Sequence, residues 1–159
     1  MARPRRRAAL RVVLDADVLI GALDRSDAHH APSRALFTDW KRRDMVRLMS
    51  VVNLTEALVA PAAETKRLRL ARRAVAALGV AIHQPAEAVG VEAARLRAAH
   101  PISLPDAYCL ATARLTGASV ASYDERVTTA AEAEGIALVE SLVDAPATAR
   151  ARRRLPGAP

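Results

Sequence analysis

The sequence predicts an α/β domain in which a parallel sheet of about four to five strands carries helices on both faces. Short apolar runs alternate along the chain with longer segments of helical pattern, and such alternation is typical of a parallel sheet that is covered on both sides. Gly79, Gly117 and Gly135 each follow a helical segment by one residue, as helix stop signals do. The length of 159 residues suits one domain with a hydrophobic core.

The elements follow in order along the chain. Strands are expected where short apolar runs occur, at residues 11–14, 47–50, 80–83, 119–122 and 137–139. Helices are expected between them, at residues 18–23, 31–43, 54–60, 62–78, 86–100, 105–116 and 125–134. We therefore divide the chain into a basic N-terminal arm at 1–10, one folded domain at 11–143 and a basic C-terminal tail at 144–159. The arm is expected to be disordered and the tail to fray.

The net charge of +7 belongs to the two ends of the chain. Residues 1–11 contain five Arg and residues 150–154 contain four, with no acid in either segment. Without these nine, 15 of the 24 basic residues remain against 17 acidic ones, so the middle carries a net charge of −2. Such arms are solvated in many proteins and bind nucleic acid in others.

Cysteine content and hydropathy bound the class of protein. A single cysteine, Cys109, excludes an internal disulfide and any metal site built from several cysteines. No apolar run is long enough to span a membrane, and the basic start is not followed by the apolar region of a signal peptide. We expect a cytoplasmic protein with no membrane partner.

Four acidic residues are placed where the predicted sheet would bring them together. Asp15 follows the first strand, Glu56 lies one helical turn after the second, and Asp124 follows the fourth. Asp106 opens the helix that leads into that fourth strand. Ligands of open parallel sheets collect at the carboxyl ends of the strands, so the four acids can converge on one edge.

Three of these acids also have a structural explanation. Asp15 or its neighbour Asp17 can cap the next helix, since Asp is a preferred N-cap residue. In "SLPD", Asp106 completes a capping box with Ser103, and Asp124 can cap the helix that follows it.

Glu56 lies in "VVNLTEALVAP", an almost entirely apolar helical segment, which predicts a buried helix. A buried carboxylate needs a partner, and no Lys or Arg lies between Arg47 and Lys66. A bound cation supplies that partner. Carboxylate oxygens favour Mg²⁺ or Mn²⁺, and none of the four histidines has the spacing of a zinc ligand.

The sequence resembles the PIN-domain ribonucleases, above all the VapC-type toxins of bacterial toxin–antitoxin pairs. The resemblance covers residues 11–143 and is carried, in order, by "VVLDADVLIGAL", "LMSVVNLTEALVA", "ISLPDAYCLATARLTGASV" and "ASYDERV". It assigns the family's four acidic metal ligands to Asp15, Glu56, Asp106 and Asp124, and it places Ser122 where relatives carry a Thr or Ser. At position 17, where relatives commonly carry Asn or Ser, this chain has an additional acid.

The resemblance implies an α/β sandwich, Mg²⁺- or Mn²⁺-dependent cleavage of RNA, a homodimer and an antitoxin partner. A metal-activated water would hydrolyse the phosphodiester, with Ser122 orienting a carboxylate or water, and the products would carry a 5′-phosphate and a 3′-hydroxyl. The basic helical segment with Lys66, Arg67, Arg69, Arg72 and Arg73 would either hold RNA phosphates or form a solvated face.

Two other functions compete with this interpretation. The domain could be a catalytically silent binding or regulatory module whose acids are helix caps, and the discriminating residue is Glu56. A haloacid-dehalogenase-like phosphatase also begins with an apolar strand and "DxD", as in "LDADVL". That chemistry needs a downstream Lys and a late acidic pair, whereas Lys41 and Lys66 are the only lysines and "SYDERV" has one Asp beside a Glu.

Overall fold

The computed structural model describes residues 10–139 of the chain. The predicted arm and tail lie outside these residues except for Leu10. The strands are β1 (Arg11–Leu14), β2 (Val46–Ser50), β3 (Val80–His83) and β4 (Ser119–Ala121), and all pair in parallel in the order β3-β2-β1-β4. The helices are α1 (Ala16–Leu23), α2 (His30–Arg42), α3 (Val51–Leu58), η1 (Pro61–Ala63), α4 (Thr65–Ala77), α5 (Glu87–Ala99), α6 (Leu104–Thr116) and α7 (Glu125–Ala133).

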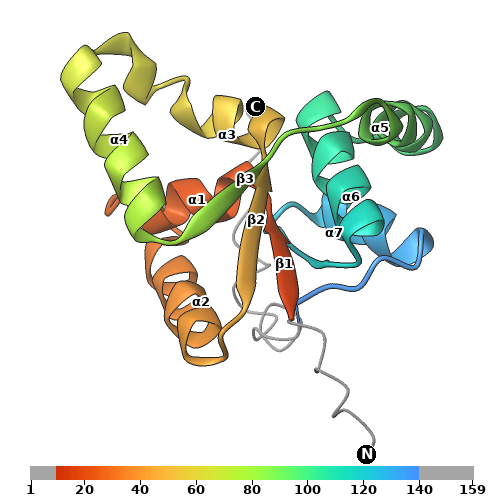
Figure 1. The fold of residues 1–159 in the computed structure, drawn as a ribbon, viewed down its shortest axis with the longest axis horizontal. Helices are drawn as coiled ribbons and strands as arrows, with labels where there is room; N and C mark the ends of the chain where they lie inside the picture. The colour runs from red at the N-terminus through yellow and green to blue at the C-terminus, as the bar shows by residue number, and fades with distance from the viewer. Residues whose placement is uncertain (1–9, 140–159) are drawn as a thin grey trace, which may run out of the picture.

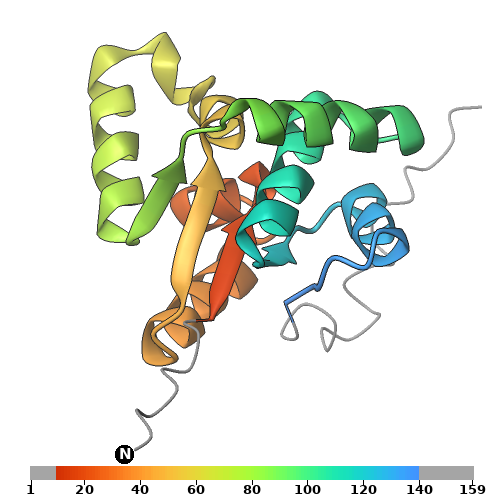
Figure 2. The ribbon, with the colours of Figure 1, turned by 45° about the vertical axis from the view of Figure 1, so that its right-hand side comes forward.

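The helices cover both faces of the sheet, as the sequence predicts. In Figures 1 and 2, α1, α2 and α4 lie on one side of the strands and α5, α6 and α7 lie on the other. The pleat of β1 serves both layers, because Val12 and Leu14 pack with α1 and α2 while Val13 packs with α5, α6 and α7. The α/β class with a four-stranded parallel sheet is therefore confirmed.

Most element boundaries agree with the sequence within three residues, and two predictions need correction. The expected strand at 137–139 forms only a single bridge, between Leu138 and Val120, within the described part of the chain. The expected helix at 62–78 is divided into η1 and α4, because Glu64 has the extended backbone of an N-cap, with φ −139° and ψ 126°. Within residues 10–139, no helix is long and apolar enough to cross a membrane.

The strand order creates a crevice at one point of the sheet. The chain adds β2 and β3 on one side of β1 and then returns to add β4 on the other side. Ligand sites of open α/β sheets lie outside the carboxyl ends of the strands where the order reverses. Here that point lies between β1 and β4, directly before Asp15 and Ser122.

Candidate functional site

Three of the predicted acids cap helices. Asp15 is the N-cap of α1 and accepts a hydrogen bond from Ala16 N at 2.7 Å. Asp124 is the N-cap of α7 and accepts one from Arg126 N at 2.8 Å. Asp106 belongs to a complete capping box on α6, in which its Oδ2 accepts from Ser103 N at 2.8 Å. The cap interpretation is confirmed for all three residues.

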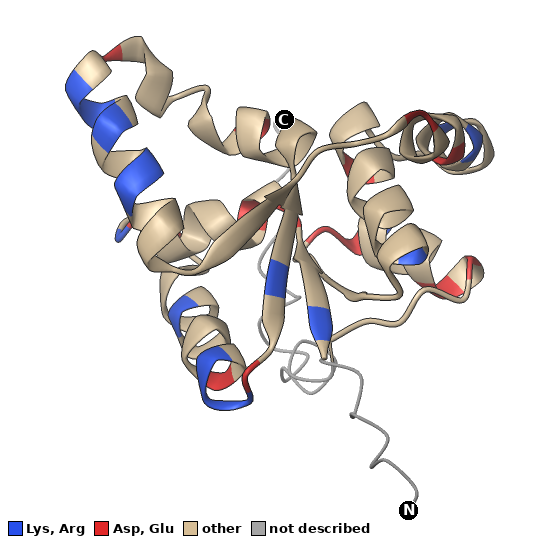
Figure 3. Ribbon diagram, viewed as in Figure 1, with Lys and Arg blue, Asp and Glu red and all other residues tan. Residues whose placement is uncertain are grey.

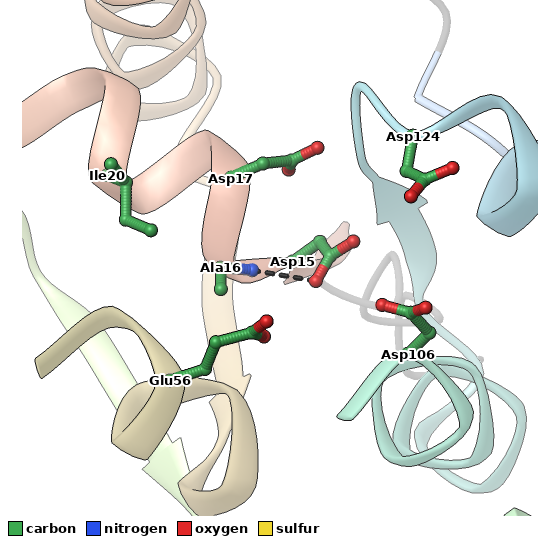
Figure 4. Close-up of a pocket in the computed structure, with 7 residues that line it drawn as sticks. All are labelled: Asp15, Ala16, Asp17, Ile20, Glu56, Asp106 and Asp124. Atoms are coloured by element: carbon green, nitrogen blue, oxygen red, sulfur yellow. Dashed lines mark hydrogen bonds between the residues drawn. The ribbon is translucent and has the colours of Figure 1, made fainter. Parts of the chain in front are cut away.

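The same acids also line one pocket. Its cavity volume is about 150 Å³, and its wall is formed by Asp15, Ala16, Asp17, Ile20, Glu56, Asp106 and Asp124. Figure 4 shows the carboxylate of Asp15 between Glu56 on one side and Asp106 and Asp124 on the other. The acids therefore meet at the crevice that the strand order creates, and they come from α1, α3 and α6 and from the caps of α1 and α7. A carboxylate that caps a helix can still face the pocket.

Ser122 connects the two strand ends beneath the pocket. Its hydroxyl donates to Asp15 Oδ2 at 2.7 Å and accepts from Asp124 N at 3.1 Å. The side chain is buried, with 3% of its surface exposed. A hydroxyl that donates to one acid and holds the backbone of another fixes their relative position, so Ser122 has the contacts that an orienting residue needs.

Asn53 is a buried polar residue of the site that the sequence reasoning missed. It lies on α3 one turn before Glu56, is fully buried, and donates from Nδ2 to Asp15 Oδ1 at 3.1 Å. Its own Oδ1 is buried with no hydrogen-bond partner among the described residues. A polar amide in an otherwise apolar stretch was the available signal, because buried Asn side chains need partners.

Asp17 does more than begin a helix. Its Oδ2 accepts a hydrogen bond from Tyr123 N at 2.8 Å, and its Oδ1 is buried without a partner in the described part of the chain. The ring of Tyr123 stacks on His29 with centroids 4.1 Å apart. Asp17 therefore ties the segment after β4 to α1 while contributing a fifth carboxylate to the pocket.

The predicted burial of Glu56 is wrong. The sequence predicts a buried carboxylate in a buried helix, whereas Glu56 is exposed, and only Asn53 and Ala57 of α3 are buried. The helix lies at the rim of the pocket, so its apolar sequence does not imply burial on every side. Glu56 still lines the pocket, but burial no longer requires a cation beside it.

The pocket wall contains five acids and no Lys or Arg among the described residues. The pKa of Asp15 is raised to about 6, chiefly by burial, although the hydrogen bond from Ser122 opposes the rise. The pKa of Asp17 is raised to about 7, by burial and then by the charge of Asp15. Partial desolvation at the rim, followed by the charge of Asp106, also raises the pKa of Glu56. Arg126 forms an ion pair with Asp124 at 3.0 Å.

The donor atoms of the pocket are of the kind that a divalent cation prefers, but their positions do not form a complete set of ligands. Its donors are all carboxylate oxygens, as hard cations prefer, and one buried oxygen of Asp17 lacks a partner in residues 10–139. Yet no three acidic, His or Cys side chains in the described residues form a group that could hold a metal ion as they stand. Mg²⁺ keeps several of its waters in protein sites, so carboxylates spread around a pocket of this size can reach such an ion through water.

Comparisons with known proteins identify the family of the chain. The family model of the PIN domain matches residues 12–133. No curated protein sequence matches the chain.

Solved structures share the fold at low sequence identity. VapC20 of Mycobacterium tuberculosis, described as a sarcin–ricin loop cleaving toxin, is 17% identical with a TM-score of 0.64, over 80% of this chain and 98% of that one. FitAcB of Neisseria gonorrhoeae is 19% identical with a TM-score of 0.60, over 82% and 98%. VapBC-1 of nontypeable Haemophilus influenzae is 10% identical with a TM-score of 0.63, over 84% and 99%. At such identities the likeness establishes the fold.

Proposed function

The chain belongs to the PIN domain family, and from that premise we propose that it is a Mg²⁺- or Mn²⁺-dependent endoribonuclease, the toxin of a type II toxin–antitoxin pair. The observation that carries the proposal is the pocket at the reversal of strand order, where five carboxylates meet without a Lys or Arg in the described wall. Capping accounts for Asp15, Asp106 and Asp124, and the hydrogen bond from Tyr123 N accounts for one oxygen of Asp17. Neither explains Glu56 at the pocket's rim or the buried, partnerless Oδ1 of Asp17. A silent scaffold gains nothing from gathering five acids in one pocket, where desolvation and neighbouring charges raise the pKa values of Asp15, Asp17 and Glu56.

We assign residues at the pocket roles in this reaction. Asp15, Asp106, Asp124 and Glu56 would hold the cation directly or through water. When bound, the cation would activate a water for in-line attack on the phosphodiester and stabilise the charge of the leaving oxygen. Ser122 donates to Asp15 Oδ2 and Asn53 donates to Asp15 Oδ1, so both oxygens of that carboxylate are held in place. No side-chain nucleophile is needed.

The partners follow from the same assignment. Several solved structures of this fold are toxin–antitoxin complexes, among them one from Klebsiella pneumoniae. We propose a cognate antitoxin that covers the acidic pocket, a homodimer and a cytoplasmic location. Sedimentation of the purified chain, alone and with a co-expressed neighbouring gene product, tests the dimer and the antitoxin.

The decisive experiment is cleavage of end-labelled RNA by antitoxin-free protein. We expect discrete cuts with Mg²⁺ or Mn²⁺, none with EDTA, and a loss of about 100-fold or more in Asp106→Asn. Asp44→Asn is the matched control, because it removes one charge from an exposed residue outside the pocket. Folded protein that cuts no RNA with either metal would favour the silent binding module instead.

A further inference from the structure

The helix α4 carries a group of cations that the acidic pocket does not use. Between Thr65 and Ala77 the helix has five basic residues and no acid, and its first turn has no acidic residue. Lys66, Arg69, Arg72 and Arg73 are all exposed, and none forms an ion pair or a side-chain hydrogen bond with the rest of residues 10–139. Arg67 differs, because it lies near an acid: hydrogen bonds from Ser26 chiefly lower the pKa of Asp24, and the charge of Arg67 adds to this.

These four cations form one stripe. At about 100° per residue they fall within roughly 120° of each other around the helix axis, and the middle of this arc lies about 120° from the buried Val75. We name this group (Lys66, Arg69, Arg72 and Arg73) the cationic stripe. Figure 3 shows the basic residues on the half of α4 that lies at the same end of the molecule as α3 and the carboxyl ends of the strands.

The stripe is unfavourable for the isolated helix. Cations near a helix N-terminus oppose the helix dipole, and like charges three or four residues apart repel each other. Both conditions occur here, in the pairs Lys66–Arg69, Arg69–Arg72 and Arg69–Arg73. Elsewhere the helices relieve such repulsion with acids, as Asp39 does for Arg42 in α2. An external polyanion would remove the repulsion in α4.

We propose that the cationic stripe binds the phosphate backbone of the RNA whose cleavage is proposed above, and so this inference rests on that function. The acidic pocket repels RNA, and the affinity must come from positive charge outside it. Lys66 to Arg73 extends over about 10 Å of helix, which corresponds to roughly three phosphates along a nucleic-acid strand. η1 contacts both α4 and α3, and α3 carries Glu56 at the pocket's rim, so an RNA strand that continues from the stripe past η1 would arrive at the pocket.

The test measures RNA binding without cleavage, so that it is independent of the catalytic proposal. A labelled single-stranded RNA is titrated with the full chain in EDTA at several salt concentrations. The α4 variant replaces all four stripe residues by Gln. Each lost phosphate contact lowers the salt slope by about 0.7, so the slope should fall by about 2 and binding at 0.1 M salt should weaken roughly 10- to 100-fold.

Two control variants make the result specific. Arg34, Lys41, Arg42 and Arg43, at α2 and its C-cap, are also exposed but lie at the other end of the molecule. Their replacement by Gln changes the net charge equally and should leave the slope nearly unchanged. The triple variant Arg69→Lys, Arg72→Lys and Arg73→Lys keeps the charges of the stripe and should bind RNA like the wild type. Circular dichroism should show the α4 variant folded, since it loses repulsive pairs.

The outcomes separate local binding from general charge. A slope that falls only in the α4 variant supports the proposal. Equal losses in the α2 and α4 variants would overturn it, because the effect would then follow net charge. An unchanged slope in the α4 variant would also overturn it, because the RNA would then bind elsewhere on the chain. No RNA binding by the wild type would overturn it as well and would leave an acidic protein segment as the candidate partner. Binding without cleavage when Mg²⁺ is added would contradict the catalytic proposal alone.

Discussion

Replacing Asp17 by Asn should stabilise the metal-free protein at alkaline pH. Asp17 Oδ2 accepts a hydrogen bond from Tyr123 N, and its Oδ1 is buried without a partner among the described residues. An amide keeps an acceptor for Tyr123 and puts a neutral group where the charge was. The pKa of Asp17 is raised to about 7 from an ordinary value of 3.8, so the substitution removes a carboxylate that the fold disfavours in its ionised form.

The size of the effect follows from proton linkage. Because the folded state binds the proton more tightly, the contribution of Asp17 to stability is fully present below about pH 3.8 and is lost as pH rises through 7. Between pH 5 and pH 7 the loss is about 1.4 kcal/mol for each pH unit. The stability of Asp17→Asn relative to wild type should therefore grow by about 2–3 kcal/mol from pH 5 to pH 8.

The assay is urea unfolding followed by circular dichroism, in EDTA, at several pH values between 5 and 8. Titrating groups far from Asp17 act equally on wild type and variant and cancel in the difference. Asp15 does not cancel, because its charge interacts with that of Asp17 and its own titration also changes when that charge is removed. Asp44→Asn is the control for loss of one negative charge, and Asn tolerates its left-handed backbone, with φ at 52°. Parallel curves of stability against pH for wild type and Asp17→Asn would refute the reasoning, because Asp17 would then ionise as easily folded as unfolded.

Three further predictions concern contacts around the site and across the helices. Ser122→Ala removes the donor that lowers the pKa of Asp15, so the pH midpoint of RNA cleavage should move upward. Ser122→Thr keeps a hydroxyl donor and should return the midpoint to its wild-type value. An unchanged pH profile in Ser122→Ala would contradict the orienting role. Asn53→Ala should lower the free energy of unfolding at pH 8 by about 1.5–3 kcal/mol, since it removes a hydrogen bond to a charged carboxylate. Urea unfolding measures this loss, and a value under about 0.5 kcal/mol would contradict the prediction. Glu134→Gln should lower the free energy of unfolding above pH 4.5, because hydrogen bonds from Arg95 and His100 lower the pKa of Glu134 to about 2. The stability that Glu134 contributes is present above pH 4.5 and is lost as pH falls toward 2, so acid titrations of the two proteins should converge at low pH.

The sequence by itself determined most of the helices and strands and the signals that end or cap several of them. Apolar runs predict all four strands, and Gly79, Gly117 and Gly135 all have a positive φ of 65–66° at the helix ends where they were expected. The caps formed by Asp15 and Asp124 were predictable too, because a cap joins a side chain to the backbone one or two residues away. The spacing of apolar residues and the capping of helix ends involve only residues close together in the sequence, so both can be predicted from the sequence.

Only the tertiary structure decided which polar groups meet. Asn53 contacts Asp15 across 38 residues, and Ser122 contacts it across 107. Asp17 binds the backbone of Tyr123 across 106 residues. The contact of Asn53 depends on β2 pairing beside β1, and the contacts of Ser122 and Tyr123 depend on β4 returning to the far side of β1. No local pattern contains this order of strands. The exposure of Glu56 has the same origin, since an apolar helix is buried only on the sides where other elements cover it. Residue types thus fix caps and periodicity, whereas the order of strands in space determines which carboxylates share a pocket.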